Sequence, residues 1–315
     1  MKLNKQSLRK SNPVHEPLLS SEEVLYFYNR GLSFTSTPEN ISRQSAQARS
    51  GSHISYFRGS GLDYDDSRAY QPGDELRNIN WRLMARTSHL FTKVFQEERE
   101  SSVILLIDRR ARMRFGTRQR LKVTRATEIA CFLAGLSLQQ GYSVGLTLLQ
   151  ADIQRLPSQR AQARVRDYLS SAASACPPLN SVSDEIKLST ILSHLLCSAT
   201  PGSRIILISD FHDIEEADKV VLTQLSVQHQ IHAIQVLDPV EESLPDDGVW
   251  LIDGYTDTRP LKINANDAGL HRHYHMARQH KQSMIESVFI ENRIPFNKLL
   301  TNDSFDDVIE KIVYV

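Results

Sequence analysis

The sequence predicts an α/β fold built on a doubly wound, mostly parallel β-sheet. Two short apolar runs, at residues 103–107 and 205–208, are rich in β-branched side chains, and each leads into an aspartate, Asp108 or Asp210. Runs of this length are typical of strands buried on both faces of a parallel sheet. Between them, apolar residues recur every three or four positions, which is the period of a helix. Because strands and helices alternate, we expect helices on both faces of the sheet.

The composition is that of an ordinary globular protein with a sizeable core. The chain has 315 residues and a formal net charge of zero, so we expect one large domain with an appendage. A neutral chain gives no bulk electrostatic reason to bind nucleic acid or a membrane. No apolar stretch is long enough to span a bilayer, and the first residues lack the hydrophobic core of a signal peptide. The three cysteines have no metal-ligand spacing, and we expect a cytoplasmic protein without a cofactor.

The first hundred residues divide into an arm and a block. Residues 1–50 are polar and predict an arm with one short helix, which a capping box at Ser20–Glu23 begins and Gly31 ends. Residues 51–100 are dense in glycine, aspartate, arginine and aromatic residues, and they predict an appended β-rich block of strands and turns. Tyr70–Asp74 is a turn, because proline presets one torsion and glycine accepts a positive one.

Residues 101–315 predict the main α/β domain with a C-terminal strand and helix. After the strand that ends at Asp108, apolar periodicity predicts a helix that Gly141 ends. The elements expected next are a strand at 144–149, a hairpin into 153–156, a helix around 165–169, a helix from 183–185 through 195, a strand at 205–210, a helix at 220–225 and a strand at 231–237. They are followed by two short strands punctuated by turns at 246–248 and Gly254, a helix at 267–291, a strand at 296–300 and a helix capped by Asp303 or Ser304.

Several motifs in residues 51–100 follow one another at regular spacing. They are Gly59-Ser60-Gly61, the run from Arg68 through Tyr70, Pro72 and Gly73 to Asp74, the run from Arg77 to Trp81, Ala85-Arg86-Thr87, Lys93 and Gln96–Arg99. Their order and spacing resemble the signature of the domain of unknown function 58 family. Phe115-Gly116 and Ser209–Phe211 extend the likeness into the main domain. Asn80 departs from it, since the family usually has aspartate there.

The resemblance implies a von Willebrand factor A-type domain with the signature block ahead of its first strand. It also implies an adaptor or chaperone-like partner of a MoxR-type AAA+ ATPase, acting on an unknown client, with no enzymatic activity established for the family. We interpret Tyr70 and Trp81 as part of a structural clasp, and expect Asp74, Arg77 and Arg86 to be charge-paired inside it. A second partner-binding surface is the open alternative.

The same resemblance implies a magnesium site, which this sequence alters. Von Willebrand A-type domains commonly hold the ion through D-x-S-x-S after the first strand, a later threonine and a later aspartate. Asp108 and Asp210 match the two acids, but Arg110 and Arg112 replace the serines. The nearest candidates for the remaining ligand are Thr190 and the Asp184-Glu185 turn. Because a divalent ion needs oxygen ligands and guanidinium groups repel it, we expect no bound metal.

The arginines suggest a substitute for the ion. A guanidinium forks onto a carboxylate with paired hydrogen bonds, so we expect Arg110 or Arg112 to pair with Asp108 and Asp210. Spare arginines would then face an acidic partner, while a purely structural ion pair is the open alternative. The rim of this degenerate metal site comprises Asp108, Arg110, Arg112, Asp210 and Asp213.

Other charged groups carry weaker predictions. We interpret the basic residues Arg118, Arg120, Lys122 and Arg125 as a solvated helix face, which makes nucleic acid an unlikely partner. His271 and His275 have metal-ligand spacing but no acid or cysteine beside them, so we expect surface histidines. The residues from Asp63 onward resemble a calcium-binding loop, but the sixth position holds Arg68 instead of glycine and the twelfth holds Asp74 instead of glutamate. We therefore expect no calcium site there. The sequence therefore favours a non-catalytic interaction protein, and the alternative is a metal-dependent hydrolase or nucleotide-binding enzyme that uses Asp108 and Asp210.

Overall fold

The chain forms two compact units. The computed structural model describes residues 17–34, 63–71, 77, 79–96, 102–117, 120–176, 185–244, 248–252, 261–264 and 267–313. One unit comprises residues 1–34 and 101–315, and the other comprises residues 35–100. Helix α1 (Ser21–Leu32), the short helix expected in the polar arm of residues 1–50, therefore belongs with the α/β unit. Residues 35–100 are an insertion between α1 and the first strand of the sheet.

A six-stranded, mostly parallel sheet forms the centre of the α/β unit, as the sequence predicts. Across the sheet the strands are β10 (Phe296–Leu300), β7 (Gln230–Leu237), β6 (Arg204–Ser209), β3 (Ser102–Asp108), β4 (Ser143–Leu149) and β5 (Ile153–Gln159). Strand β5 follows β4 through a tight hairpin and is antiparallel to it, while each other neighbouring pair is parallel. The chain starts in the middle of the sheet, moves to the β5 edge, and then returns to build the opposite edge.

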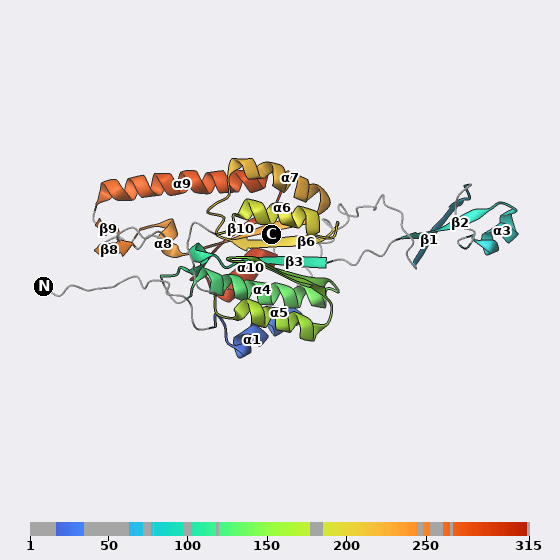
Figure 1. The fold of residues 1–315 in the computed structure, drawn as a ribbon, viewed down its shortest axis with the longest axis horizontal. Coiled ribbons are helices and arrows are strands. Elements are labelled where there is room, and N and C mark those ends of the chain that lie inside the picture. Colours follow the sequence, from blue (N-terminus) through green and yellow to red (C-terminus); the bar gives the residue numbers. More distant parts are fainter. Residues whose placement is uncertain are drawn as a thin grey trace. The chain divides into compact units, whose positions relative to one another are not determined.

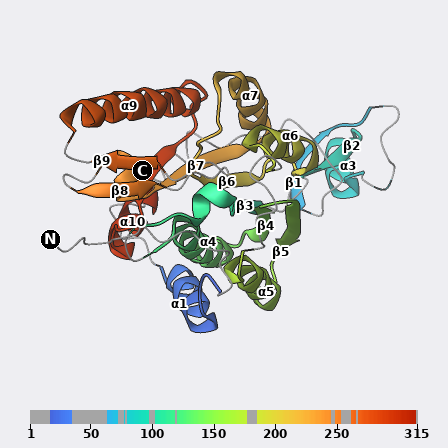
Figure 2. The ribbon, with the colours of Figure 1, turned by 60° about the vertical axis from the view of Figure 1, so that its left-hand side comes forward.

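Helices cover both faces of this sheet (Figures 1 and 2). The first face carries α1, α4 (Lys122–Gln139), α5 (Gln162–Ala173) and α10 (Phe305–Val313), and the second carries α6 (Leu188–Ser198), α7 (Lys219–Gln228) and α9 (Ala268–Glu291). Each face has its own hydrophobic core. In β3, Leu105 packs into the first core and Leu106 into the second. Because both faces are buried, the strand is a continuous apolar run rather than an alternating one.

Most elements lie where the periodicity predicts them. Gly141, with φ of +84°, follows the end of α4, and the hydroxyl of Ser304 accepts a hydrogen bond from the Asp307 amide at the start of α10. Two details differ. Helix α6 begins at Leu188 rather than at residues 183–185, and α7 buries Leu222 while it exposes Val220.

Short elements follow β7 in the α/β unit. They are α8 (Pro239–Glu242) and the antiparallel strands β8 (Val249–Ile252) and β9 (Leu261–Asn264). Two short strands were expected around Gly248 and Gly254. Strand β8 directly follows Gly248, whereas β9 begins seven residues after Gly254. Among the described residues, no helix combines the length and the hydropathy that a bilayer crossing needs.

Two glycines let α1 approach α4 at backbone contact. A Cβ atom added to Gly31 would lie 2.0 Å from the carbonyl oxygen of Phe132, and one added to Gly135 would lie 2.1 Å from the carbonyl oxygen of Tyr28. A side chain at either position would therefore push the helices apart. Around this crossing, α1 buries Val24 and Phe27 against the first core. The N-terminal helix is thus an integral layer of the α/β unit.

The inserted unit contains a β-hairpin and a short helix. Strands β1 (Asp63–Ala69) and β2 (Phe91–Gln96) pair in antiparallel fashion, and α3 (Trp81–Thr87) lies between them in the sequence. The side-chain oxygen of Asn80 accepts a hydrogen bond from the Leu83 amide at 3.1 Å and caps α3. An aspartate would cap the helix equally well, so the departure of Asn80 from the expected motif preserves this local role.

Candidate functional site

The predicted acids meet at one edge of the sheet. Because β3, β6 and β7 are parallel, their carboxyl ends lie together, and the chain leaves β3 and β6 in opposite directions across the sheet. In open α/β sheets, ligands bind in the crevice at such a reversal of strand order. Asp108 ends β3, and Asp210 directly follows β6. The candidate site therefore occupies the position where this class of fold places its functional groups.

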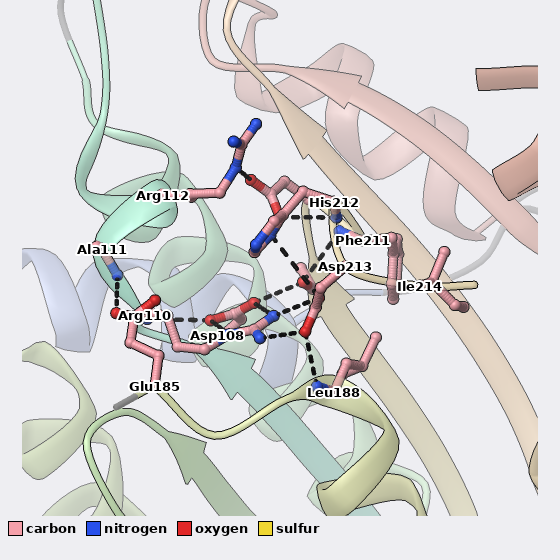
Figure 3. Close-up of polar contacts among 12 residues, drawn as sticks. Asp108, Arg110, Ala111, Arg112, Glu185, Leu188, Phe211, His212, Asp213 and Ile214 are labelled. Carbon is pink, nitrogen blue, oxygen red and sulfur yellow. Dashed lines mark hydrogen bonds and ion pairs between the residues drawn. The ribbon is translucent and has the colours of Figure 1, made fainter. Parts of the chain in front are cut away.

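Arg110 joins two of the predicted acids. Its guanidinium donates to Asp108 from Nε at 3.0 Å and from Nη2 at 2.8 Å, and to Asp213 from Nη1 at 2.5 Å and from Nη2 at 2.9 Å (Figure 3). The hydroxyl of Ser209 donates to the remaining side of Asp108 at 2.6 Å. Arg110, Asp108 and Ser209 are buried. The expected pairing of Arg110 with Asp108 is therefore confirmed, and the same guanidinium also holds Asp213.

Asp210 has a different principal cation. The ammonium of Lys122 lies 2.8 Å from Asp210 and 2.8 Å from Glu241, whereas Nε of Arg112 lies 3.7 Å from Asp210. On the other side, Nδ1 of His212 lies 2.9 Å from Asp210 Oδ1. Lys122 is fully buried, so the prediction that it lies on a solvated helix face is wrong. The reason is that the first turn of α4 points into the carboxyl edge of the sheet.

A signal for this lysine was present in the sequence. Lys122 stands four residues before Ala126 and seven before Ile129, both of which are buried on α4. Residues three, four or seven positions apart share one face of a helix. A lysine on the apolar stripe of a core helix predicts a buried cation, and a buried cation needs an acid. The strand-end aspartates were the available partners.

Mutual attraction fixes the charge states of these groups. Burial alone would raise the pKa of Asp210, but Lys122 and the contact with His212 hold that pKa well below its usual value. Burial would lower the pKa of Lys122, yet the two facing carboxylates raise it above its usual value. In the same way, burial would raise the pKa of Asp213, but the hydrogen bonds and positive charge of Arg110 have the larger effect and lower it. Asp210, Lys122 and Asp213 are therefore ionised at neutral pH.

A third strand-end aspartate also belongs to this edge. Asp238 directly follows β7, is fully buried, and accepts a hydrogen bond from the Thr117 amide at 2.8 Å. The hydroxyl of Thr301, just after β10, donates to it at 3.2 Å. Sequence reasoning identified the strand but did not include this acid in the site. The signal was the same strand-then-aspartate pattern that identified Asp108 and Asp210.

Two arginines next to Arg110 point inward rather than toward a partner. Arg109 donates to the carbonyl oxygens of Ser174 at 2.7 Å and Ala175 at 3.1 Å. Arg114 donates from Nε to the carbonyl oxygen of Arg109 at 3.0 Å, and both arginines are buried. The expectation of several spare arginines at the rim is therefore wrong for these two. Backbone carbonyls that have no helix or strand partner attract them into the protein.

The other basic residues of the predicted helix face are also largely internal. Arg125 is buried, donates to the carbonyl oxygens of Thr301 at 2.9 Å and Asp303 at 2.6 Å, and pairs with Glu128 at 2.9 Å. Burial, together with the nearby Arg120, lowers the pKa of Arg125 to about 10. Arg120, which is partly exposed, also pairs with Glu128. The run of basic residues thus connects α4 to the loop after β10.

The loop after β6 has an unusual backbone at Phe211. Its φ is +55°, a region that bulky residues rarely adopt. The amide of Phe211 donates to the Ser209 hydroxyl at 3.1 Å, and its ring packs on Phe289 with centroids 4.9 Å apart. These contacts stabilise the turn that directs His212 and Asp213 toward the site. Such conformations occur at functional sites, where the surrounding structure holds them in place.

The remaining candidate ligands lie in different places. Thr190 is exposed on α6, and Glu185 accepts a hydrogen bond from the Ala111 amide at 2.6 Å (Figure 3). Asp184 lies outside the described residues. Within the described part of the chain, no three histidine, cysteine or acidic side chains come together in a group that could hold a metal ion. His275 is exposed and His271 is half-buried on α9.

The signature block is more open than the predicted clasp. Trp81 is 61% exposed, Arg77 and Arg86 are exposed, and Tyr70 is half-buried. The interpretation of Trp81 as a buried clasp residue is therefore wrong, and no described acid pairs with Arg77 or Arg86. The other signature residues are less informative: Arg68 lies in β1, and Pro72, Gly73 and Asp74 lie outside the described residues.

Comparison with known proteins gives relatives that are themselves uncharacterised. The chain is 28% identical over 199 residues to the uncharacterized protein Rv1480 of Mycobacterium tuberculosis (strain H37Rv), which covers 63% of this chain and 62% of that protein. It therefore spans less than two thirds of the length of that relative. Over 42 residues, or 13% of this chain and 11% of the relative, it is 45% identical to the uncharacterized protein YeaD of Bacillus subtilis.

The solved structures found are distant. The conserved hypothetical protein BatB of Bacteroides thetaiotaomicron aligns over 66% of this chain and 95% of its own, with a TM-score of 0.43 and 15% identity. An aerotolerance-related membrane protein of Bacteroides fragilis aligns over 68% and 98%, with a TM-score of 0.42 and 16% identity. Likeness at this level carries no functional assignment.

The family comparison covers most of the chain. Residues 66–284 match the family described as "Protein of unknown function DUF58", a stretch that includes the signature motifs from Arg68 to Arg99 and all the strand-end acids discussed above. This agrees with the resemblance read from the motifs, and the chain belongs to the DUF58 family.

Proposed function

We propose that the protein is a non-catalytic interaction module whose docking face is the carboxyl edge of the sheet. One observation carries the proposal: two cations of the chain itself already pair with the strand-end acids. Arg110 pairs with Asp108 and Asp213, and Lys122 pairs with Asp210 and Glu241. Acids that are already paired and buried are poor ligands and poor bases. The site is therefore suited to present a shaped, charged surface to another protein.

The α/β unit is best described as von Willebrand factor A type. In support, the first strand of its sheet lies in the middle, the antiparallel strand lies at one edge, and the strand-end acids Asp108 and Asp210 lie at the crevice between β3 and β6. The magnesium ion that such domains commonly hold does not fit the residues present here. A divalent ion between Asp108 and Asp210 would have to displace Arg110 and Lys122 from the interior. No step of the proposed function uses a metal.

Two arginine side chains reach solvent at this edge. The side chain of Arg112 is 40% exposed and that of Arg120 34%, whereas Asp108 and Asp210 are buried. His212 is partly exposed next to Arg112. A guanidinium at a rim forms paired hydrogen bonds with a carboxylate. The docking face therefore favours an acidic side chain of a partner.

The partner proposed for this face is a MoxR-type AAA+ ATPase, in an adaptor or chaperone-like arrangement in the cytoplasm. The support for this partner is the family resemblance, together with a site that suits an acidic contact. The ATPase would supply the energy of ATP hydrolysis, and this protein would link it to a client. This division of roles requires no catalytic group in the present chain.

The test is a binding measurement with the MoxR-type ATPase encoded in the same genome. We expect the full chain to bind the immobilised ATPase and R112E to weaken binding about tenfold or more, since charge reversal at a contact costs at least about 1.4 kcal/mol. R164E, at an exposed arginine of α5 away from the site, is the matched control and should bind as the unmodified chain does. No binding by the unmodified chain, or equal binding by R112E, would contradict the proposal.

The alternative enzyme has one favourable observation, the contact of His212 with Asp210 at 2.9 Å. A catalytic pair of this kind also needs a reacting group nearby, and the hydroxyl of Ser209 is buried and hydrogen-bonded to Asp108. A thermal-shift screen with magnesium, manganese and ATP distinguishes the two functions. An increase in melting temperature that is lost in D210N would favour the enzyme, because only a ligand of the folded state stabilises it.

A further inference from the structure

The inserted unit exposes a second surface, on α3. A tryptophan is usually among the most buried residues of a protein, yet Trp81 is 61% exposed and Leu90, just after the helix, is 42% exposed. Leu83 and Met84 are partly buried, whereas Arg82, Ala85 and Arg86 are exposed. The helix therefore has an outward face made of Trp81, Arg82, Ala85 and Arg86.

The outward face has a regular layout. Residues four positions apart are neighbours on a helix, with Cβ atoms roughly 5–6 Å apart. Trp81 thus lies beside Ala85, whose small side chain leaves the indole open, and Arg82 lies beside Arg86 in a parallel row. Arg77 is exposed just before the helix. The result is one flat aromatic group next to a row of guanidinium groups.

The charge of this surface is of one sign. No acid in the described part of the chain pairs with Arg82 or Arg86, and none of the described side chains from 79 to 92 is acidic. Trp and Arg are the residue types that contribute most to protein–protein binding energy. A surface of this composition, left without internal partners, is complementary to carboxylates that flank an apolar side chain.

We propose that the α3 face, comprising Trp81, Arg82, Ala85 and Arg86, docks an acidic segment of a partner protein. The partner places an apolar side chain against the indole, and its carboxylates, one helical turn or two strand positions apart, pair with Arg82 and Arg86. In the sequence the insertion is joined to the α/β unit at both ends, since α1 precedes it and β3 follows it.

Single-stranded nucleic acid is a weaker match to the same face. Such ligands stack successive bases on several aromatic side chains along a basic groove. Among the described side chains of residues 35–100, Trp81 is the one exposed aromatic group. The proposal does not depend on the docking face at Arg112, and R112E is expected to leave binding at α3 unchanged.

The test is a selection from a phage-displayed library of random 16-residue peptides on the immobilised full chain. We expect enriched peptides to carry aspartate or glutamate on both sides of an apolar residue. Their affinity should fall about tenfold or more in W81A and in R82E/R86E, and should stay the same in R164E. The milder R82Q/R86Q variant should lose affinity too, so the result does not rest on a variant that fails to fold.

Three results would overturn the proposal. The enriched peptides could show no acidic bias, or they could bind W81A and R82Q/R86Q as tightly as the unmodified chain. The third is binding of a (dT)20 oligonucleotide that is as tight as peptide binding or tighter and that depends on Trp81 in the same way. Oligonucleotide binding is measured from the fluorescence of the indole, with W81F as the comparison. That result would assign the face to nucleic acid.

Discussion

Lys122 and Asp210 form the buried ion pair on which the candidate site depends. Each would be costly to bury alone, because an ion loses its hydration inside a protein. Together with Glu241 they form a compact arrangement of one ammonium and two carboxylates at 2.8 Å. Removing the ammonium leaves Asp210 and Glu241 without the cation that lies closest to both, since Nε of Arg112 is 3.7 Å from Asp210.

The substitution K122M tests the strength of this arrangement. Methionine has a similar length and no charge, so it keeps most of the packing and removes only the cation. We expect the free energy of unfolding to fall by about 3–5 kcal/mol, the usual cost of leaving a buried charge unpaired. Urea unfolding measures it. K298M, which breaks the exposed pair with Glu242, is the control and should cost less than about 1 kcal/mol.

The same variant should respond to pH in a defined direction. In the unmodified protein the pKa of Asp210 lies well below its usual value, so its stabilising effect is complete at pH 5–7 and is lost only as pH falls through that lowered pKa. Without Lys122, burial raises the pKa of Asp210, and the folded state of K122M takes up a proton more readily than the unfolded state. The difference in unfolding free energy between the two proteins should therefore shrink from pH 7 to pH 5. A constant difference would show that Asp210 does not depend on Lys122.

The sequence could predict part of this site. Strand-end aspartates are visible because an apolar run leads into each, and Arg110 is close enough in the chain to reach Asp108. Lys122 and Asp238 were missed because their partners are distant in the sequence and only the parallel sheet brings them together. That Arg109 points into the protein could not be predicted either. Its acceptors are backbone carbonyl oxygens, which every residue has, so no residue type in the sequence identifies them.

At the scale of elements, the contact of α1 with α4 is the most sharply constrained. The added Cβ of Gly135 would meet a backbone oxygen of α1, which cannot turn away as a flexible side chain can. The two helices must separate to relieve the contact, and the apolar residues around the crossing would lose packing.

We therefore expect G135A to lower the free energy of unfolding by about 1–3 kcal/mol, even though alanine favours a helix more than glycine does. Faster proteolysis near α1 should accompany the loss. G269A is the matched control, because a Cβ there meets only the Asp267 side chain at 3.0 Å. If G135A is as stable as the unmodified protein, the close helix crossing is wrong.

Elements with strong local signals were predictable, and those set by tertiary contacts were not. Strand β10 has the expected bounds, and α9 begins within one residue of its expected start because Asp267 caps it. The short helix expected in the polar arm of residues 1–50 is present as α1, but its docking on α4 was not predicted, because the glycines that let the two helices approach have no periodic signal. Trp81 was expected inside a clasp because aromatic residues are usually buried, and its exposure depends on the surrounding fold.

At the scale of the whole molecule, the two units should differ in stability. The α/β unit buries two hydrophobic cores around six strands, whereas the inserted unit holds a two-stranded hairpin with a seven-residue helix. An isolated two-stranded hairpin is marginal in water. Hydrogen–deuterium exchange should thus be fast at β2 amides and slow at β3 and β6 amides. Equal protection in β2 and β3 would mean that the units unfold together.

The central claim is that side-chain cations of the chain occupy the ion position of this sheet edge. Titration calorimetry with magnesium, repeated with manganese, tests it most directly on the full chain. With Arg110 and Lys122 in place, we expect no saturable heat up to millimolar ion. Binding of one ion per chain that disappears in D108N and D210N would contradict the claim, because it would show that the two strand-end aspartates ligate a metal in this protein.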